Sequence, residues 1–270
     1  MKITNLDVKK YKRFFAFGCS FTSYKWMTWA DIIGNDIEYY ENWAEKSAGN
    51  HFIFNSVIEA DTRYNFNEDD LVMVFWTTKQ REDRYLENKW IHATPASVES
   101  TYSKDWIKKF FLDQRSFLIR DLGYIKATQQ ILNSKNCDWS NLCWNEFFDC
   151  EALGETYRLS NNKESLLAEW QRLSKEVFIG KPIPELFDNR DVIKLYQDVF
   201  TNIHGVYRWF ENEYIKNRSA PDNDLHPIPT EALHFLDVIF PDNNISELTR
   251  NIVKTQDLYT DLNRPIVKRL

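Results

Sequence analysis

Two residues far apart in the sequence stand where a nucleophile and its base could stand. Ser20 lies in the short turn "GCSFT" (18–22), which follows an apolar run typical of a buried strand. His226 precedes a helical pattern and has Asp224 two residues upstream and Asp222 four residues upstream. A carboxylate near an imidazole orients the ring and stabilises its cation, as a general base requires. We expect Asp224 to be that acid, with Asp222 as the second candidate.

Ser20 also has a simpler explanation and a rival. A serine between a strand and a helix is the usual cap of that helix. Cys19 is a second possible nucleophile, but neighbouring side chains point in different directions, so only one of the two can face a site. The remaining cysteines are Cys137, Cys143 and Cys150. Because the chain has no Cys-x-x-Cys pair and no histidine near these three at zinc-ligand spacing, we expect reduced, mostly buried thiols.

The elements that must position these residues alternate between strands and helices. Apolar runs predict strands at 13–18, 36–44, 69–78 and 137–148. Helical spacing predicts helices near 26–33, 50–60 and 117–135, and another that ends the stretch 221–240. This order predicts parallel strands joined by crossover helices, in a three-layer α/β/α architecture. Because such strands end at one carboxyl edge, the loops that hold Ser20 and His226 converge there.

The domain organisation follows from the same patterns. We expect a single domain over 1–270, with charged, helical patterns over 79–135. From about 150 to 218, helical signals carry scattered aromatic residues, which predicts a largely helical insertion that caps the sheet edge. Aromatic clusters of this kind are most often core, and some line a ligand pocket.

Composition narrows the classes of function. The net charge of −6 and the lack of a basic stripe argue against nucleic-acid binding, which needs Lys and Arg to neutralise phosphates. No uninterrupted apolar run is long enough for a membrane span, and the first twelve residues are too charged for a signal peptide. We therefore expect a cytoplasmic protein without a membrane span. Phosphate-loop and dinucleotide glycine motifs are absent.

Four segments together resemble the SGNH (GDSL-like) hydrolases, in particular the divergent type whose first block reads Gly-Cys-Ser-Phe-Thr. They are, in order, "FGCSFT" (17–22), "NWAEKSAGN" (42–50), "VFWTTKQRED" (74–83) and "DNDLHP" (222–227). The resemblance covers the predicted sheet, roughly 13–80, 117–148 and 220–240, and leaves out the helical insertion. It implies a flavodoxin-like sheet and a serine esterase or acylhydrolase that needs no metal or organic cofactor.

The resemblance also implies roles for individual residues. Ser20 attacks the ester carbonyl, His226 accepts its proton, and Asp224 holds the imidazole. The backbone N–H groups of Ser20 and Gly49 receive the oxyanion. The family works on lipid, acyl-thioester and O-acetylated sugar esters. An aromatic-rich insertion slightly favours a carbohydrate ester, because aromatic faces stack on sugar rings.

The sequence departs from the family pattern at two positions. The third block usually supplies an Asn to the oxyanion hole, whereas "WTTKQ" (76–80) has none, so Thr78 or Thr77 must donate a hydroxyl instead. The last block usually carries its acid three residues before the His, where this chain has Asn223. These departures leave a non-catalytic binding or assembly protein as an alternative.

A third class is a metal-dependent glycosyltransferase. In this reading, Asp222 and Asp224 form an Asp-x-Asp motif that chelates a divalent ion on a nucleotide-sugar. Such activity would require a metal, whereas a serine hydrolase retains its activity in the presence of a chelator.

Overall fold

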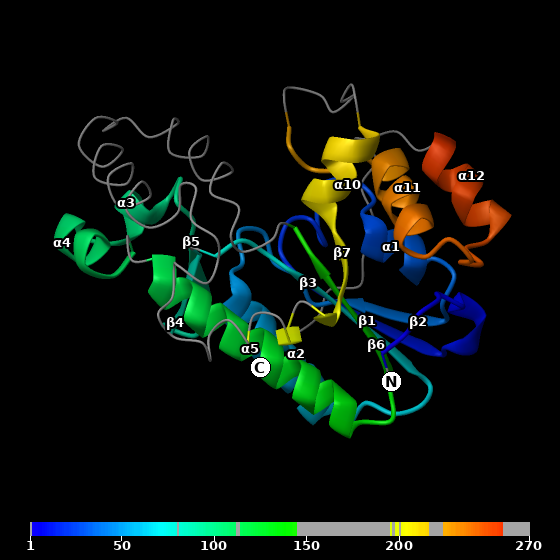
Figure 1. The fold of residues 1–270 in the computed structure, drawn as a ribbon, viewed down its shortest axis with the longest axis horizontal. Helices are drawn as coiled ribbons and strands as arrows, with labels where there is room; N and C mark the ends of the chain where they lie inside the picture. The colour runs from blue at the N-terminus through cyan, green and yellow to red at the C-terminus, as the bar shows by residue number, and fades with distance from the viewer. Residues whose placement is uncertain are drawn as a thin grey trace.

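A five-stranded parallel sheet forms the centre of the protein (Figure 1). The computed structural model describes residues 2–144 apart from 80, 112 and 113, together with 195, 198–199, 201–215 and 224–255. The strands are β1 (Arg13–Phe17), β2 (Tyr39–Asn42), β3 (Asp70–Trp76), β6 (Asp138–Cys143) and β7 (Ile203–Val206), in the order β2-β1-β3-β6-β7. This is the flavodoxin-like order, and it confirms the predicted α/β class with a parallel sheet.

The central strand β3 shows why this chain forms a covered sheet. All seven residues of "DLVMVFW" are buried, as expected for a parallel strand with helices on both faces. Its first residue, Asp70, is buried as well and pairs with Arg13 of β1, whose Nε lies 2.5 Å from the carboxylate. That ion pair holds the amino ends of β1 and β3 in register, with Arg13 opposite Asp70.

Helices cover both faces of the sheet. On one face, α2 (Asn50–Tyr64) packs against α5 (Gln114–Ser134). On the other lie α1 (Trp29–Gly34), α11 (Pro229–Ile239) and α12 (Glu247–Thr255) (Figure 1). The Phe75 ring of β3 contacts both Trp29 of α1 and Phe235 of α11, at centroid distances of 6.0 and 6.5 Å, which joins these helices to the same face.

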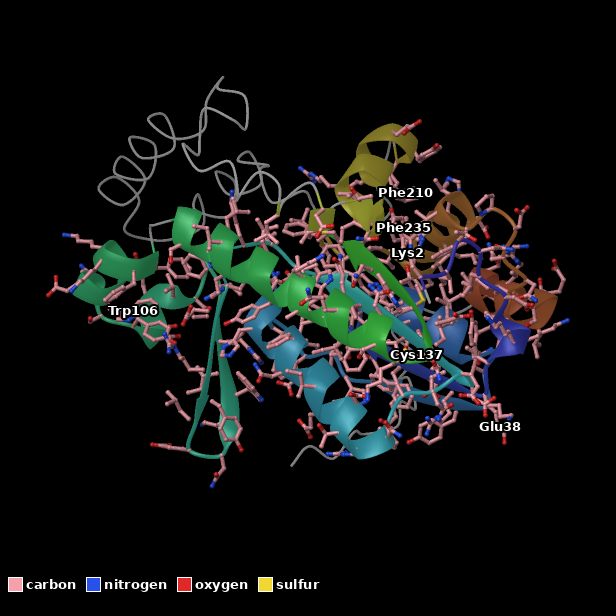
Figure 2. All side chains as sticks on the ribbon, turned by 60° about the horizontal axis from the view of Figure 1, so that its bottom comes forward. Lys2, Glu38, Trp106, Cys137, Phe210 and Phe235 are labelled. Atoms are coloured by element: carbon pink, nitrogen blue, oxygen red, sulfur yellow. The ribbon has the colours of Figure 1, made fainter. Side chains whose placement is uncertain are left out.

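Further elements surround this core. A 3₁₀ turn, Val8–Lys10, precedes β1, and α10 (Tyr207–Tyr214) follows β7. Figure 2 labels Phe210 and Phe235, whose ring centroids lie 5.4 Å apart and seat α10 against α11. Among the described helices, none has the length and the apolar content needed to cross a membrane.

A β-hairpin follows β3, where the sequence predicted only helical patterns. Its strands are β4 (Glu82–Leu86) and β5 (Lys89–Ala93), and the turn residues Glu87 and Asn88 both have positive φ, as a two-residue hairpin turn requires. Short helical segments follow, namely α3 (Val98–Thr101), α4 (Lys104–Trp106) and a π-helical turn (Ile107–Phe111). Four of the ten strand residues are exposed, and the buried Glu82 and Asp83 are charged, so these strands lack the apolar alternation that identifies a strand.

The stretch predicted to be a largely helical insertion also contains a strand. Strand β7 (Ile203–Val206) lies within the stretch 150–218 and pairs with β6, so the sheet takes up the chain again there. Four residues are too few to show a strand period, and helical patterns flank them on both sides. Residues 150–194 of the insertion and the tail 256–270 lie outside the described residues.

Candidate active site

The turn after β1 places Ser20 at the carboxyl edge of the sheet. The backbone N–H groups of Thr22 and Ser23 both donate to the carbonyl oxygen of Cys19, at 2.9 and 3.1 Å, which closes the turn. The side chain of Thr22 lies so close to residue 18 that only glycine fits there, because a Cβ at this position would lie 2.1 Å from Thr22 Oγ1. Helix α1 begins only at Trp29, so Ser20 is not its cap.

Ser20 and Cys19 differ sharply in their surroundings. Cys19 is completely buried within the hydrophobic core, as are Cys137 and Cys143. Cys150 lies outside the described residues. Ser20 is partly exposed, and its Oγ lies 2.8 Å from Nε2 of His226. The side chain that faces the histidine is therefore the hydroxyl and not the thiol.

Ser20, His226 and Asp224 form a continuous hydrogen-bonded chain. On the far side of the ring from Ser20, Nδ1 of His226 lies 2.6 Å from Oδ1 of Asp224, and the same oxygen accepts the backbone N–H of His226 at 3.0 Å. An ionised carboxylate only accepts, so Nδ1 carries the proton and Nε2 accepts from the Ser20 hydroxyl. Asp222 and Asn223 lie outside the described residues.

Asp224 is held in its charged form. Burial alone raises the pKa of this carboxyl, but the hydrogen bonds from Tyr24 and His226 outweigh burial and lower the pKa from 3.8 to about 2. The Tyr24 hydroxyl donates to Oδ2 at 2.5 Å, and Lys25 Nζ lies 3.4 Å from the same oxygen. The carboxylate is thus ionised at any pH near neutrality.

Tyr24 contacts both members of the His226–Asp224 pair. In addition to its hydrogen bond to Asp224, its ring stacks on the imidazole, with centroids 3.8 Å apart and planes 14° apart. Burial of Tyr24 and its hydrogen bond to Asp224 raise the pKa of its phenol, so it remains a donor. Sequence reasoning missed this residue, because its only signal is an aromatic side chain four positions after Ser20.

A hydrogen bond from a buried tryptophan fixes the loop that carries His226. The indole Nε1 of Trp26, a fully buried side chain, donates to the carbonyl oxygen of Pro227 at 2.6 Å. Two residues later Pro229 begins α11, where its fixed φ suits the first helical turn. The short run between His226 and the helix therefore has little freedom to move away from Ser20.

Ser20 and His226 open onto a cleft of about 250 Å³ at the point where the strand order reverses. Ser20 follows β1 and Thr78 follows β3, and parallel α/β sheets bind their ligands in the crevice between two such strands. The described residues that line the cleft are Ser20, Phe21, Ser47, Thr78, Arg81, Thr94, Pro95, Trp144, Leu225 and His226. The structure thus brings Thr78 into the same cleft as Ser20, as expected.

Gly49 has a different partner from the one expected. Its backbone N–H donates to Asp83 Oδ1 at 2.9 Å instead of pointing at a substrate oxygen, and Asp83 Oδ2 accepts the N–H of Phe52. A Cβ at residue 49 would lie 2.6 Å from Asp83 Oδ2, so the glycine allows the hairpin to approach the start of α2. Thr77 is tied by its backbone to the side chain of Asn50.

Ser47 is a further cleft residue that sequence reasoning missed. It lies in a turn closed by the N–H of Ala48 and the carbonyl of Glu45, and its φ of 66° is in the left-handed region. Glycine or asparagine normally occupies this turn position, and backbone strain of this kind often marks a functional site. The polar run "EKSAGN" (45–50) signalled the turn but not its conformation.

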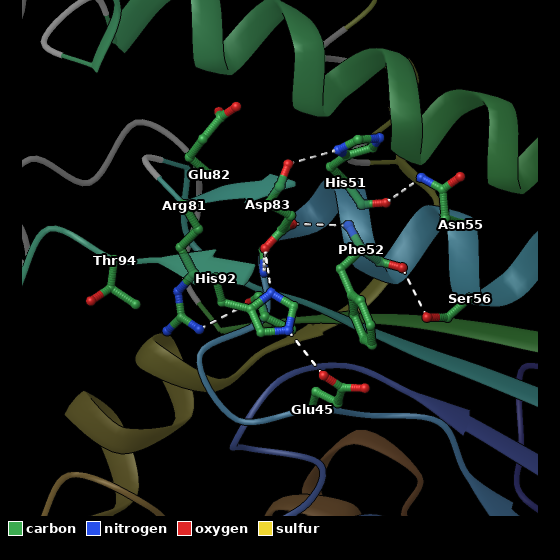
Figure 3. Close-up of polar contacts among 12 residues, drawn as sticks. Glu45, His51, Phe52, Asn55, Ser56, Arg81, Glu82, Asp83, His92 and Thr94 are labelled. Atoms are coloured by element: carbon green, nitrogen blue, oxygen red, sulfur yellow. Dashed lines mark hydrogen bonds and ion pairs between the residues drawn. The ribbon is translucent and has the colours of Figure 1, made fainter. Parts of the chain in front are cut away.

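A partly buried histidine, His92, ties this turn to the hairpin. Figure 3 shows His92 between two carboxylates, with Nδ1 2.8 Å from Asp83 Oδ1 and Nε2 3.0 Å from Glu45 Oε2. Burial lowers the pKa of His92, but hydrogen bonds to Asp83 and Glu45 and their charges outweigh burial and raise the pKa above 6.5. The ring of His92 therefore links the segment before Ser47 to β4 and β5.

The comparisons with family models, with curated proteins and with solved structures find no match to this chain. Among the described residues, no group of three or more His, Cys, Asp or Glu side chains is placed to hold a metal ion. Both oxygens of Asp224 already accept hydrogen bonds from Tyr24 and His226.

Proposed function

We propose that this protein is a serine esterase that hydrolyses short acyl esters through Ser20, His226 and Asp224. One observation carries the proposal, namely the hydrogen-bonded chain from Ser20 Oγ through both ring nitrogens of His226 to Asp224. Ser20 and His226 line a cleft at the carboxyl edge of the sheet, where an ester can reach the serine. The four matching segments of the sequence support the same reaction.

The reaction follows from the positions of the three groups. As Ser20 Oγ bonds to the ester carbonyl carbon, its proton moves to Nε2 of His226, and the adjacent carboxylate of Asp224 stabilises the resulting imidazolium. The imidazolium then gives this proton to the departing alcohol as the carbon–oxygen bond breaks. A water molecule repeats the sequence on the acyl-serine, which releases the carboxylic acid and restores the Ser20 hydroxyl.

The oxyanion requires donors other than Gly49, whose N–H is directed at Asp83. Two candidates are the backbone N–H of Ser20, in the tight turn, and the hydroxyl of Thr78, which lines the cleft. Ser47 is a third candidate, since its strained turn also borders the cleft. Preorganised donors of this kind stabilise the tetrahedral intermediate more than the substrate, which is what acceleration requires.

A small recess beside Ser20 indicates that the acyl group of the ester is short. The recess measures about 10 Å³, which is room for roughly one water-sized group such as a methyl. Its walls are mostly aromatic and come from the turn, β3 and three helices: Phe21, Tyr24, Trp29, Phe75, Tyr207 and Phe235, with Ser20, Thr28, His226, Pro227 and Ala232. We infer that acetyl esters are preferred over longer acyl chains.

The proposal is tested by the turnover of 4-nitrophenyl acetate and 4-nitrophenyl butyrate. We expect Ser20→Ala to abolish the hydrolysis of the acetate, while Ser23→Ala, in the same turn and outside the walls of the cleft and the recess, retains it. Cys19→Ala should retain most of the activity. If Cys19→Ala is inactive and Ser20→Ala is active, the thiol is the nucleophile. If the wild-type protein binds esters without cleaving them, the binding-protein alternative is correct.

A further inference from the structure

The cleft beside Ser20 contains a cation that no carboxylate of the described residues neutralises. Of the described residues that line the cleft, Arg81 is the one whose side chain is always charged. The neighbouring carboxylates have other partners. Glu82 pairs with both Arg84 and Arg120, at 2.8 and 2.7 Å, and Asp83 pairs with His92. The positive charge of Arg81 is therefore available to a molecule in the cleft.

Arg81 is held at a defined place in that cleft. Its Nη1 donates to the carbonyl oxygen of Ala48 at 3.0 Å, between the turn residue Ser47 and the start of α2. The Cβ of Arg81 packs closely against Gly49. A Cβ added at residue 49 would lie only 2.8 Å from the Cβ of Arg81, so only glycine fits at this position. Figure 3 shows the side chain of Arg81 extending from the start of the hairpin on the side of Thr94, another cleft residue.

The chemistry of this setting points to an anionic ligand. A guanidinium anchored through one nitrogen still presents its other N–H groups, and it binds a carboxylate or phosphate in a planar, charge-assisted geometry. One exposed lysine adds positive charge close to the histidine, since Lys46 Nζ lies 5.7 Å from the centroid of the Tyr24 ring, which stacks on His226. A partly buried cation without a carboxylate partner is costly unless its ligand supplies the opposite charge.

We propose that the natural ester carries an anionic group in its alcohol part and that Arg81 binds this group. The inference rests on the proposed esterase function and adds the class of substrate. The recess beside Ser20 holds at most a small acyl group, so the rest of the ester occupies the cleft in which Arg81 lies. The substrate class is thus a short acyl ester of an alcohol that bears a carboxylate or a phosphate.

The test compares two acetyl esters of similar size, the anionic 4-acetoxybenzoate and its neutral analogue 4-acetoxybenzamide. For the wild-type protein we expect a higher kcat/KM for the anionic ester, with a preference that falls as salt rises from 50 to 500 mM because ions screen the attraction. Arg81→Gln should lower kcat/KM for the anionic ester about 10-fold, the loss of one charge-assisted hydrogen bond, and leave the neutral ester nearly unchanged. Arg81→Lys should retain part of the preference.

Arg84→Gln provides the matched control. Arg84 lies on the same hairpin, its side chain is 53% exposed, and it does not line the cleft, so this variant should keep the wild-type preference. An equal loss for both esters in Arg81→Gln would show that Arg81 only supports the loop, and the inference would be wrong. An unchanged preference in that variant would also overturn it. If the wild-type protein hydrolyses neither ester nor 4-nitrophenyl acetate, the esterase function fails and the inference fails with it.

Discussion

Replacing Asp224 with Asn removes a charge while changing almost no volume. In the native site, Oδ1 accepts two N–H groups of His226 and Oδ2 accepts the Tyr24 hydroxyl, so both oxygens act as acceptors. An amide has one acceptor oxygen and one NH₂ group. If its oxygen stays on His226, the NH₂ group faces the Tyr24 hydroxyl. If the amide turns over, its NH₂ group faces Nδ1 and favours the ring tautomer that cannot accept the serine proton.

The size of the effect follows from these contacts. Loss of the acid from a Ser-His-Asp arrangement costs about 10⁴ in kcat, because the imidazolium loses its counter-ion and the tautomer is no longer fixed. At 1.36 kcal/mol for each factor of ten, this loss is about 5 kcal/mol of transition-state stabilisation. Asp224 is placed both to fix the tautomer of His226 and to stabilise its cation, since its Oδ1 lies 2.6 Å from Nδ1 of His226. We therefore expect Asp224→Asn to lower kcat for 4-nitrophenyl acetate by about 10⁴.

The pH dependence adds a check on the same residue. The folded-state pKa of Asp224 is about 2, below its ordinary 3.8, so the stability that its charge contributes is full above about pH 4 and is lost as the pH falls through 2. Asp224 therefore does not titrate between pH 5 and 9. The acid limb of the pH–rate profile in this range should show a single ionisation, that of the imidazole.

The assay measures kcat and KM for 4-nitrophenyl acetate between pH 5 and 9, with Asp222→Asn as the control. We expect Asp222→Asn to leave kcat and KM for 4-nitrophenyl acetate nearly unchanged. The reverse pattern, a large loss in Asp222→Asn and a loss below tenfold in Asp224→Asn, would make Asp222 the acid. If neither substitution matters, a backbone carbonyl orients His226, the site is a dyad, and the reasoning from the Asp224 contacts is wrong.

Two further predictions concern residues that surround the hydrogen-bonded Ser20, His226 and Asp224. Tyr24→Phe keeps the ring that stacks on His226 but removes the 2.5 Å hydrogen bond to Asp224, so kcat for 4-nitrophenyl acetate should fall about tenfold with little change in KM. A change in KM alone would contradict a positioning role. For His92, the raised pKa means that its contribution to stability is full below pH 6.5 and is lost as the pH rises through the folded-state value. Urea unfolding at pH 5.5 and 8.5 should therefore show a fall in stability that is smaller in His92→Gln, and an identical fall in both proteins would refute this.

The sequence predicted most of the fold, because its buried elements have clear patterns. The run at 69–78 contains β3, the predicted helix near 50–60 begins at the residue where α2 begins, and the run at 117–135 lies almost wholly within α5. The hairpin at Glu82–Ala93 and the strand β7 escaped prediction. The buried residues of β4 are the charged Glu82 and Asp83, and β7 is very short, so neither the hairpin nor β7 has the apolar period of a buried strand.

The site was predictable where it depends on the sheet and unpredictable where it depends on distant contacts. Ser20 and His226 could be placed together because loops at the carboxyl edge of a parallel sheet converge, although their chemical roles remain predictions. The partner of Gly49 could not be foreseen. Its N–H bonds to Asp83, 34 residues later, through a hairpin that the sequence did not indicate. The positions of Tyr24 and Arg81 likewise follow from tertiary packing.

The nucleophile is most directly identified by labelling with a fluorophosphonate probe, followed by mass spectrometry of the modified peptide. Attack by an activated serine forms an oxygen–phosphorus bond and releases fluoride, while the histidine takes the serine proton. The hydrogen bond of 2.8 Å from Ser20 to His226 predicts one adduct for each chain, located on Ser20 and absent from both Ser20→Ala and His226→Ala. An unlabelled wild-type protein, or an adduct on any other residue, would contradict the assignment of Ser20 as the nucleophile.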